Sequence, residues 1–502
     1  MYKSSHVTKT HPLITTACLW FLCACNPANL VNTSSPQGDT APFILGDTGQ
    51  PSIPDDTEET TGYDFDETDT QAPVSNIHIN VHQMVNTMLV VDWTQNEEIE
   101  AIWVEYTFEN DEWQATPSAP VGLGVNEVSL LGIPSDTEVT LRLKIQKDGK
   151  ESTSQQFTKS TDSLPASLPQ PTLISYNPEL ASDHDWVMIS VDTKETGNWY
   201  GGPYYLLIMD RYARVVWYYK VPDRDACMFP QVSRDQTHII FDESTSYNFS
   251  NSTPQLRRVT LDFKYNETID IPGFVYGFTE MPNNTILRDR RQANDYRLLE
   301  QFEDGSTREI WNCDNWLEGV GGDGPGSSCY TNAVNWSEAT DTVLWSLVYH
   351  DTVVEIDRES GDVVRVFGKM ANTHTTTPSR TEFDFQHYPN WTADGTIMAS
   401  MHITGEKDQQ RAREYTVNDE TGELIELWSY GSDIDEYAYY SGEAYKLGNG
   451  NVVMNYGTGG AAREVTPDKD VAWDITWGEW LLTGHLSVIE DLYELNRGPT
   501  ND

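Results

Sequence analysis

The residues of this chain best suited to catalysis or ligand binding are three histidines and the polar and aromatic residues near them. A neutral imidazole is a good nucleophile near pH 7, and tyrosine rings can stack on a phenolic or glycan ligand. The candidates are His387, His350, His402, Tyr330, Asn332 and Tyr349. Each histidine could instead be a packed or exposed structural residue. No GxSxG, HExxH or paired-carboxylate signature indicates a hydrolase built on other residues.

The six cysteines fall into two groups. Three lie within the first 25 residues, and Cys227, Cys313 and Cys329 lie in the body of the chain. Cys313 and Cys329 flank a glycine-rich loop and could pair in an oxidising compartment, which would leave Cys227 as a buried free thiol. No CxxC pair or His/Cys spacing predicts a zinc site, and GGDGPG is too short and too poor in acids for a calcium loop. We expect no metal site.

The N-terminal residues resemble an export signal. Two lysines precede an apolar run, Leu13–Cys23, which at about eleven residues is too short for a membrane-spanning helix and suits a signal peptide. The run leads into Leu-Cys-Ala-Cys, which resembles a bacterial lipobox with Cys25 as the lipidated residue. An ordinary secretory signal with an incidental cysteine is the alternative. Residues 1–24 thus predict a lipoprotein signal peptide. Because Asn26, and not a retaining Asp, follows Cys25, we expect an outer-membrane lipoprotein, on the periplasmic or the cell-surface face.

Residues 25–75 predict a disordered acidic tether. Asp, Glu, Thr, Pro, Gly and Ser dominate, and few apolar residues offset the chain entropy. The whole chain of 502 residues carries a formal net charge of −46. Nucleic acid is therefore a poor partner, because phosphate binding needs basic patches. A solvated acidic surface is the simplest account of this charge, and an anionic substrate would need a local positive pocket.

Residues 76–165 predict a small β-sandwich. NIHINVH and MLVVDWTQ alternate apolar and polar side chains, and Pro134-Ser135-Asp136 marks a turn between two later strands. Trp93 and Trp103 are expected in its core. The segment resembles a fibronectin type III sandwich, with Val139 where an aromatic residue is usual. No ligand feature is recognisable, so we expect a spacer or stabilising domain.

Residues 170–495 contain an internal repeat, which predicts the elements that must position the histidines. A strand, an Asp-centred turn and a second strand recur at Asp210, Asp262, Asp304, Asp357, Asp419 and Asp468. These aspartates are about 40 to 60 residues apart, a spacing that suits a four-stranded propeller blade. A second sequence motif, again two strands joined by a turn, alternates with this Asp-centred motif and carries hairpin turns such as Asn-Gly and Asp-Gly. Together the two motifs supply four strands per blade.

An all-β chain is therefore predicted, with a six-bladed β-propeller preceded by the sandwich. Closing the blades into a ring protects the sheet edges, and the central channel collects the ends of the inner strands. The recurring tryptophans are expected to pack the blades: Trp217, Trp311, Trp428 and Trp473.

The order and spacing of the two motifs resemble the bacterial arylsulfate sulfotransferase family over roughly residues 170–480. The strongest stretches are SLVYHDTVVEIDRESGDVVRVFGK, FDFQHYPNWTADGTIMAS, REYTVNDETGELIELWSYG and EAYKLGNGNVVMNYGTGGAAREV. The sharpest element is the Gln386-His387 pair just before an inner strand. Members of this family join a small N-terminal β-domain to a six-bladed propeller.

The resemblance implies a ping-pong sulfuryl transfer without a cofactor. The histidine at the position of His387 attacks the sulfur of a phenolic sulfate, releases the phenol, and passes the sulfuryl group to a phenolic acceptor. Such a transfer needs mainly positioning and positive donors around the sulfuryl oxygens. The resemblance also implies that His350 faces the channel as a second catalytic histidine. The expected substrate-binding residues are Tyr330, Asn332, Tyr349 and His402.

Three positions depart from the family's pattern. Tyr330 stands where the family has a histidine, two residues before the retained Asn332. In the family's Ser-Arg-His run, His350 is retained but Tyr349 replaces the arginine that clamps the sulfate. A further histidine expected near Tyr276 is absent. Since loss of one oxyanion donor can cost about 10²–10³ in rate, these changes weaken the inference of the standard reaction. The arginines of residues 287–292 could offer replacement charge.

Two hypotheses follow from these residues. The first is a sulfotransferase that moves a sulfuryl group between phenolic partners at the end of a lipid-anchored tether. The alternative is a surface propeller that has lost catalysis and binds a glycan, a phenolic compound or a protein. A channel mouth that brings His387 and His350 together, with an arginine nearby, would favour the first hypothesis, and a His387 that points into the blade packing would exclude it.

Overall fold

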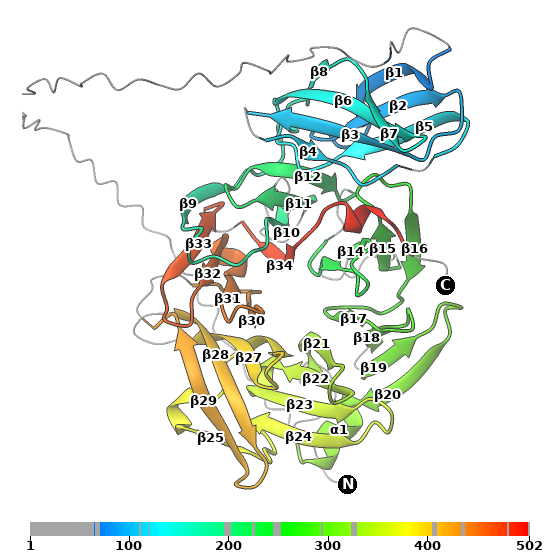
Figure 1. Ribbon diagram of the computed structural model, residues 1–502. Helices are drawn as coiled ribbons and strands as arrows, with labels where there is room; N and C mark the ends of the chain where they lie inside the picture. The colour runs from blue at the N-terminus through cyan, green and yellow to red at the C-terminus, as the bar shows by residue number, and fades with distance from the viewer. Residues whose placement is uncertain are drawn as a thin grey trace, which may run out of the picture. The chain divides into compact units, whose positions relative to one another are not determined.

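The structure is a computed structural model that describes residue 65 and residues 71–109, 112–119, 121–194, 202–222, 226–243, 253–292, 295–322, 329–403, 409–432, 437–478 and 481–499. In this part of the chain β-strands dominate, and the α-helix found there is α1 (Cys313–Gly319) (Figure 1). None of the helices described is long and apolar enough to cross a membrane. The predicted signal peptide, Cys25 and nearly all of the predicted tether lie outside the described residues.

Two small sheets form from residues 74–160. One contains β1 (Val74–Val81), β2 (Leu89–Gln95) and β5 (Gly124–Leu130). The other contains β3 (Ala101–Phe108), β4 (Gln114–Ala115), β6 (Glu138–Lys147), β7 (Lys150–Thr153) and β8 (Phe157–Ser160). Apolar residues from both sheets share one buried cluster, which includes Trp93. The expectation that Trp103 lies in this core was wrong, because Ile102 and Val104 take the inward positions of β3 and leave Trp103 half-buried.

Six further sheets follow, each containing four antiparallel strands. The first joins β10 (Trp186–Asp192), β11 (Tyr204–Asp210) and β12 (Val215–Lys220) to β34 (Thr483–Ile489). The second contains β13 (Gln231–Val232), β14 (Ile239–Glu243), β15 (Gln255–Val259) and β16 (Asn266–Asp270). The third contains β17 (Phe278–Glu280), β18 (Ile286–Gln292), β19 (Asp295–Gln301) and β20 (Thr307–Asn312).

The remaining three sheets repeat this order. The fourth contains β21 (Thr331–Ser337), β22 (Thr342–Leu347), β23 (Thr352–Asp357) and β24 (Val363–Gly368). The fifth contains β26 (Gln386–Trp391), β27 (Ile397–Ile403), β28 (Gln409–Asn418) and β29 (Glu423–Tyr430), with β25 (Thr375–Thr377) parallel to β29. The sixth contains β30 (Glu443–Lys446), β31 (Val452–Asn455), β32 (Ala461–Val465), β33 (Val471–Thr476) and β9 (Thr172–Tyr176).

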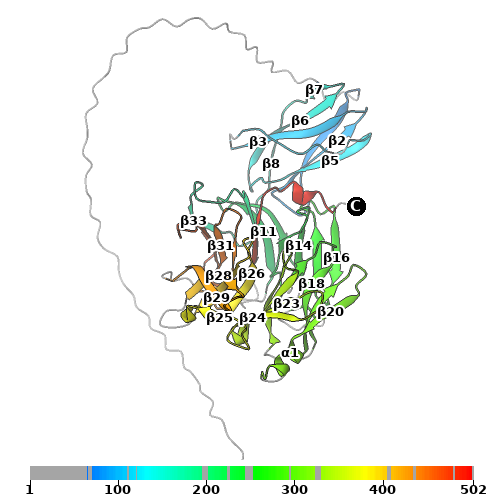
Figure 2. The ribbon, with the colours of Figure 1, turned by 60° about the horizontal axis from the view of Figure 1, so that its bottom comes forward.

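The six sheets are arranged around a common centre, as Figures 1 and 2 show. The strands at the inner edges of the sheets are β13, β17, β21, β26, β30 and β34. Contacts link β17 to β21, β21 to β26, β26 to β30 and β34 to β13. The ring closes by pairing strands from opposite ends of the repeat region. β34 pairs with β10 and becomes the inner strand of the first sheet, while β9 pairs with β33 at the outer edge of the sixth.

A buried glutamate recurs in the third strand of four consecutive sheets. Its side chain accepts a hydrogen bond from a residue of the preceding hairpin, at 2.6–2.8 Å in every case. The four pairs are Thr285–Glu300, Thr342–Glu355, Thr396–Glu414 and Asn451–Glu464. Burial costs a carboxylate free energy unless it is paired, so each of these needs a cation.

Three of these glutamates pair with a cation from the next sheet around the ring, and Glu300 also pairs with Arg308 of its own sheet at 2.7 Å. Arg358 follows β23 and reaches Glu300 at 3.2 Å, and Lys446 in β30 reaches Glu414 at 3.0 Å. The last sheet finds its cation in the first one, since Arg211, after β11, pairs closely with Glu464. Glu355 pairs instead with Arg365 of β24, in its own sheet, at 2.7 Å. The ion pairs therefore tie the third, fifth and sixth sheets to the next sheet, including across the closure of the ring.

The cysteines of the body are arranged as follows. Cys313, the first residue of α1, and Cys329, just before β21, form a disulfide with their Cα atoms 5.9 Å apart. Cys227 is a free, fully buried thiol, and burial together with the charges of Asp242 and Glu243 raises its pKa well above the usual value.

Candidate functional site at the centre of the ring

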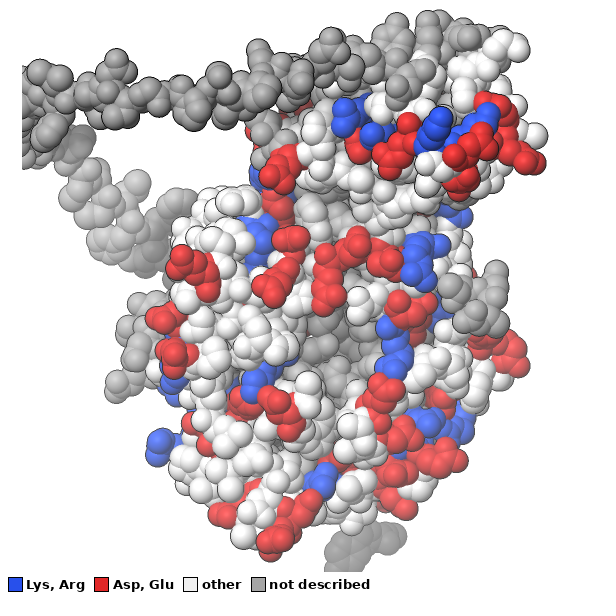
Figure 3. All heavy atoms as spheres, viewed as in Figure 1, with Lys and Arg blue, Asp and Glu red and all other residues white. Residues whose placement is uncertain are grey.

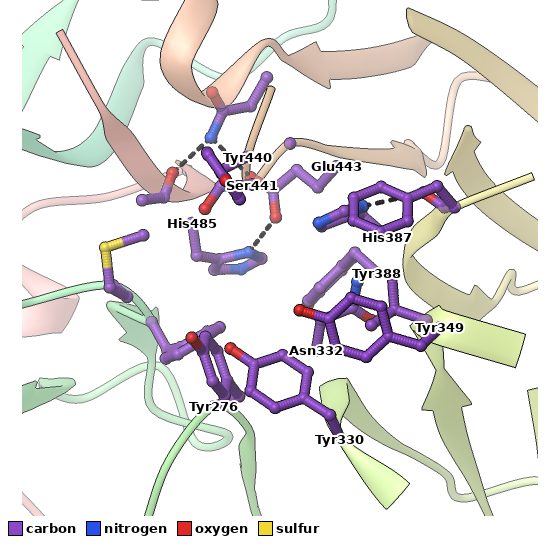
Figure 4. Close-up of a pocket in the computed structure, with 17 residues that line it drawn as sticks. Tyr276, Tyr330, Asn332, Tyr349, His387, Tyr388, Tyr440, Ser441, Glu443 and His485 are labelled. Atoms are coloured by element: carbon purple, nitrogen blue, oxygen red, sulfur yellow. Dashed lines mark hydrogen bonds and ion pairs between the residues drawn. The ribbon is translucent and has the colours of Figure 1, made fainter. Parts of the chain in front are cut away.

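A cavity of about 260 Å³ lies where the inner strands begin, and every sheet of the ring lines it. The contributions are Phe229 just before β13, Tyr276 just before β17, Asn332 in β21, His387 in β26, Glu443 in β30 and His485 in β34. Figure 4 shows their labelled side chains converging on one space. Residues far apart in the sequence thus meet here because each inner strand starts at the same end of the ring.

Three aspartates, two of them fully buried, fix the loops that carry the lining residues. Asp242 accepts hydrogen bonds from the backbone N–H groups of Met228 and Phe229 at 2.8 and 2.7 Å. Asp289, fully buried in β18, accepts from three successive N–H groups, at residues 275–277, over 3.1–3.3 Å. Asp351 accepts from the N–H of Phe385 at 2.6 Å. These carboxylates replace the missing strand hydrogen bonds of the loops and hold the lining in place.

The environment of Asp289 predicts an unusual pH dependence of stability. Burial, partly offset by the backbone hydrogen bonds and by Arg288, raises the pKa of Asp289 to about 7. The folded protein therefore holds this proton to higher pH than the unfolded chain does, and stability falls as the pH rises through that window. In the variant Asp289→Asn, the amide oxygen can still accept from the three N–H groups that Oδ1 binds in wild type. The amide nitrogen takes the place of Oδ2, which makes no hydrogen bond, and the side chain no longer titrates.

We expect wild type to lose about 2–3 kcal/mol of unfolding free energy relative to Asp289→Asn between pH 5 and pH 8. Urea unfolding of both proteins at the two pH values measures this difference. Parallel pH curves would contradict the assignment of the titration to Asp289.

His387 lies in the cavity wall, with one ring nitrogen hydrogen-bonded to the backbone and the other directed toward the cavity. Its Nδ1 is 3.1 Å from the carbonyl oxygen of Phe385, an arrangement in which Nδ1–H donates and Nε2 keeps its lone pair. The second nitrogen points toward the cavity in Figure 4. Burial, only partly offset by this hydrogen bond, lowers the pKa of His387 to about 4. The imidazole is thus neutral and nucleophilic at ordinary pH.

The backbone on either side of His387 is strained. Phe385 and Tyr388 have φ angles of 47° and 50°, and Ser441, across the cavity, has 58°. Left-handed backbone at a residue with a side chain costs about 1–3 kcal/mol and clusters at functional sites. All three residues line the cavity.

The other predicted histidines lie close by but outside the cavity lining. His402 is buried behind His387, with the two rings stacked at 4.1 Å and 9°. Burial and the adjacent His387 lower the pKa of His402 well below its usual value, so both rings are neutral. His350 ends the short helix η2 (Val348–His350), and its Nε2 is buried without a hydrogen-bond partner. The structure therefore does not bring His350 and His387 together in one lining.

Tyr330, Asn332 and Tyr349 do line the cavity. The rings of Tyr276, Tyr330, Tyr349, Phe385 and His387 form a continuous row with successive centroids 4.7, 5.4, 6.1 and 5.3 Å apart. Asn332 donates from Nδ2 to the carbonyl of Gln386 at 2.8 Å, and its Oδ1 makes no hydrogen bond. The row of rings can therefore stack on a flat aromatic ligand.

A histidine–glutamate pair faces this aromatic row. Nδ1 of His485 is in close contact with Oε2 of Glu443, which is 3 % exposed. The other oxygen of Glu443 accepts from the N–H of Leu486 at 2.5 Å. Figure 4 shows the imidazole on the opposite side of the cavity from Tyr330 and Tyr349.

Positive side chains are absent from the described lining, which contains neither Lys nor Arg. The arginines of residues 287–292 are engaged elsewhere. Arg288 is buried and donates hydrogen bonds to the side-chain oxygen of Gln301 and the carbonyl of Pro272. Arg290 lies 3.4 Å from Asp295. The guanidinium of Arg291 lies over the ring of Tyr296. Acidic and basic side chains are interspersed around the central hollow in Figure 3. Any anion in the cavity must rely on neutral donors and imidazoles.

The sequence interpretation missed Glu443 and His485. Glu443 occupies in β30 the register position that His387 has in β26. Glu443 pairs with Asn455, three residues beyond the partner of Lys446, as His387 pairs with Ser400, three residues beyond the partner of Trp391. Glu443 could have been found by aligning the sequence of β30 (EAYK) with that of β26 (QHYPNW). His485 lies on β34, which follows the last repeat, and no local pattern marks that strand as an inner one.

Among the described residues, no group of three or more His, Cys, Asp or Glu side chains could hold a metal ion. The chain matches no family model, and no curated protein matches it.

Solved structures resemble the chain weakly. A protein of unknown function from Bacteroides caccae is similar with 14 % identity and a TM-score of 0.39, over 58 % of this chain and 93 % of that one. Virginiamycin B lyase from Staphylococcus aureus has 15 % identity and a TM-score of 0.34, over 58 % and 84 %. An auxiliary nutrient binding protein from Bacteroides ovatus has 11 % identity and a TM-score of 0.34, over 80 % and 86 %. Similarities this weak assign neither a family nor a function.

Proposed function

We propose that this chain is an arylsulfotransferase-like enzyme that moves a sulfuryl group from a phenolic sulfate to a phenolic acceptor through a covalent intermediate on His387. In this proposal the six sheets are the blades of a six-bladed β-propeller, and residues 74–160 are a fibronectin type III-like sandwich. Cys25 carries the lipid that anchors the exported protein to the outer membrane.

The observation that carries the proposal is the free nitrogen of His387 in an aromatic cavity. A neutral imidazole whose Nδ1–H is held by the Phe385 carbonyl presents Nε2 as the attacking atom. The strained backbone at Phe385 and Tyr388 supports a function for this segment beyond packing.

A second support is that positions selected by the family resemblance gather at this cavity. Tyr330, Asn332, Tyr349 and His387 line it together, as does Tyr276, near which the family has another histidine. A cavity of about 260 Å³ has room for a phenolic ring together with a sulfuryl group.

The test is to trap the intermediate. Wild type is mixed with a 4-nitrophenyl sulfate donor and no acceptor, quenched, and its peptides are analysed by mass spectrometry. We expect a sulfuryl group on the peptide containing His387, formed together with one burst of nitrophenol. Absence of both burst and adduct with several aryl sulfates would refute the proposal.

The alternative is a propeller that binds a phenolic or glycan ligand without reaction. The specific observation in its favour is the lack of Lys and Arg in the described lining, which deprives an anionic donor of its usual clamp. Under this alternative, calorimetry would detect a simple phenol binding equally to wild type and to a His387→Ala variant, and neither protein would turn over any donor.

A further inference from the structure

We propose that His485, held by Glu443, is the acid and base of the reaction: it gives a proton to the departing phenol oxygen and takes one back from the acceptor. This inference rests on the proposed function and adds the proton transfers that His387 cannot perform. Covalent attack uses the one free nitrogen of His387, so another group must protonate the leaving oxygen.

The ring and backbone of His485 are held by the surrounding structure, and one ring nitrogen is left to contact a ligand in the cavity. Nδ1 is committed to Oε2 of Glu443, and the backbone N–H of His485 donates to the carbonyl of Met228 at 2.7 Å. The ring packs against Tyr388, with centroids 4.8 Å apart. Nε2 is thus the nitrogen left to meet a ligand, on the cavity wall that faces the tyrosine row (Figure 4).

Glu443 is held as firmly as the ring it orients. Its Oε1 accepts from the Leu486 N–H at 2.5 Å and from Nδ2 of Asn455 at 3.5 Å. Asn455 is itself fixed, since its Oδ1 accepts from the hydroxyl of Thr483 at 2.6 Å and from the N–H of Gly457 at 3.0 Å. Glu443 is accordingly a positioning residue: it sets the tautomer of His485 and offsets the charge of the imidazolium.

The two imidazoles of the cavity therefore have opposite surroundings. Burial of His387, only partly offset by its hydrogen bond to the Phe385 carbonyl, lowers its pKa and favours the uncharged form. His485 instead has a carboxylate, Glu443, as the partner of its Nδ1. Environments that separate two like groups in this way divide the roles of nucleophile and proton carrier between them.

The cycle balances with these two residues alone. Nε2 of His387 forms a bond to sulfur as the sulfur–oxygen bond to the aryl group breaks, and the aryl oxygen takes the proton from Nε2 of His485. The acceptor phenol then binds, gives its proton to the now neutral His485, and its oxygen bonds to sulfur as the nitrogen–sulfur bond breaks. Both histidines return to their starting states.

The test compares leaving groups in a single turnover. 4-Nitrophenol leaves as a stable anion and needs little protonation, whereas unsubstituted phenol needs a proton. In His485→Gln and in Glu443→Gln, we expect formation of the sulfo-enzyme from 4-nitrophenyl sulfate to slow less than about 3-fold, and that from phenyl sulfate to slow about 10²–10³-fold. Added imidazole should restore the phenyl sulfate reaction in His485→Ala. The matched control is His184→Gln, which alters a histidine 3.8 Å from Glu490 outside this cavity and should leave both rates unchanged.

Equal loss with both leaving groups would overturn the inference, because a merely structural role slows every donor alike. That outcome would leave the proposed function standing, since wild type would still form the adduct on His387. Failure of wild type with both donors would instead refute the proposed function, and the proton-transfer role of His485 with it.

Discussion

His387→Ala should abolish sulfuryl transfer, lowering turnover of an aryl sulfate by at least about 10³-fold, as removal of a covalent nucleophile generally does. The burst of released phenol should disappear with it. The fold should persist, because His387 makes one hydrogen bond, to the carbonyl of Phe385, and the ring stacked behind it, His402, stays buried. The measurement is stopped-flow release of 4-nitrophenol, with the same thermal unfolding profile required of both proteins.

The pH profile gives a second, independent check on His387. Because burial lowers its pKa to about 4, the nucleophile stays unprotonated down to that pH. The acid limb of kcat/KM for the donor should therefore lie near pH 4, well below the value of an exposed histidine. Turnover that survives in His387→Ala, or an acid limb belonging to another group, would remove His387 from the mechanism.

Arg211→Leu should be the most damaging single substitution in the ring outside the core, lowering the unfolding free energy by about 3–5 kcal/mol. Arg211 is buried and supplies the cation for the fully buried Glu464, and its guanidinium lies 4.9 Å from the ring centroid of Trp473. Its loss leaves a carboxylate without a counter-charge where the first and last sheets meet. Urea unfolding, followed by the β-sheet signal, measures the change.

Two further variants separate this explanation from a general loss of packing. Arg297 pairs with Glu309 at the surface, where an ion pair is worth about 0–1 kcal/mol, so Arg297→Leu should change stability little. The double variant Arg211→Leu, Glu464→Leu removes both buried charges and should recover part of the loss. A single variant as stable as wild type would show that the pair contributes nothing to ring closure.

Local pattern was enough to predict most of the elements of this chain. The Asp-centred and hairpin motifs correspond to strands of the six sheets, for example Asp357 at the end of β23 and the Asp394-Gly395 turn between β26 and β27. These succeed because alternation and turn chemistry are properties of neighbouring residues. The predicted pairing of Cys313 with Cys329 likewise needed only their positions around one loop.

Features set by distant pairing could not be predicted in the same way. His485 gains its place in the cavity because β34 pairs with β10, about 300 residues earlier in the chain, and no local pattern records that register. Tyr349 lines the cavity, but the next residue, His350, does not. Both lie in the tight turn of η2, in which successive side chains point in different directions. The recurring Glu300, Glu355 and Glu414 were visible in the sequence as acids within apolar strands, a signal that becomes meaningful once the strands are known to be buried on both faces.

The closure of the ring by β34 also sets the order in which the cavity can come into existence during synthesis. β10 is made early, and its sheet lacks an inner strand until β34 has been made. β34 brings with it His485 and the N–H of Leu486 that holds Glu443. A growing chain can therefore fold most of its sheets while the cavity stays open on one side and its histidine–glutamate pair unformed. The cavity is therefore completed late, when one strand of seven residues enters the gap.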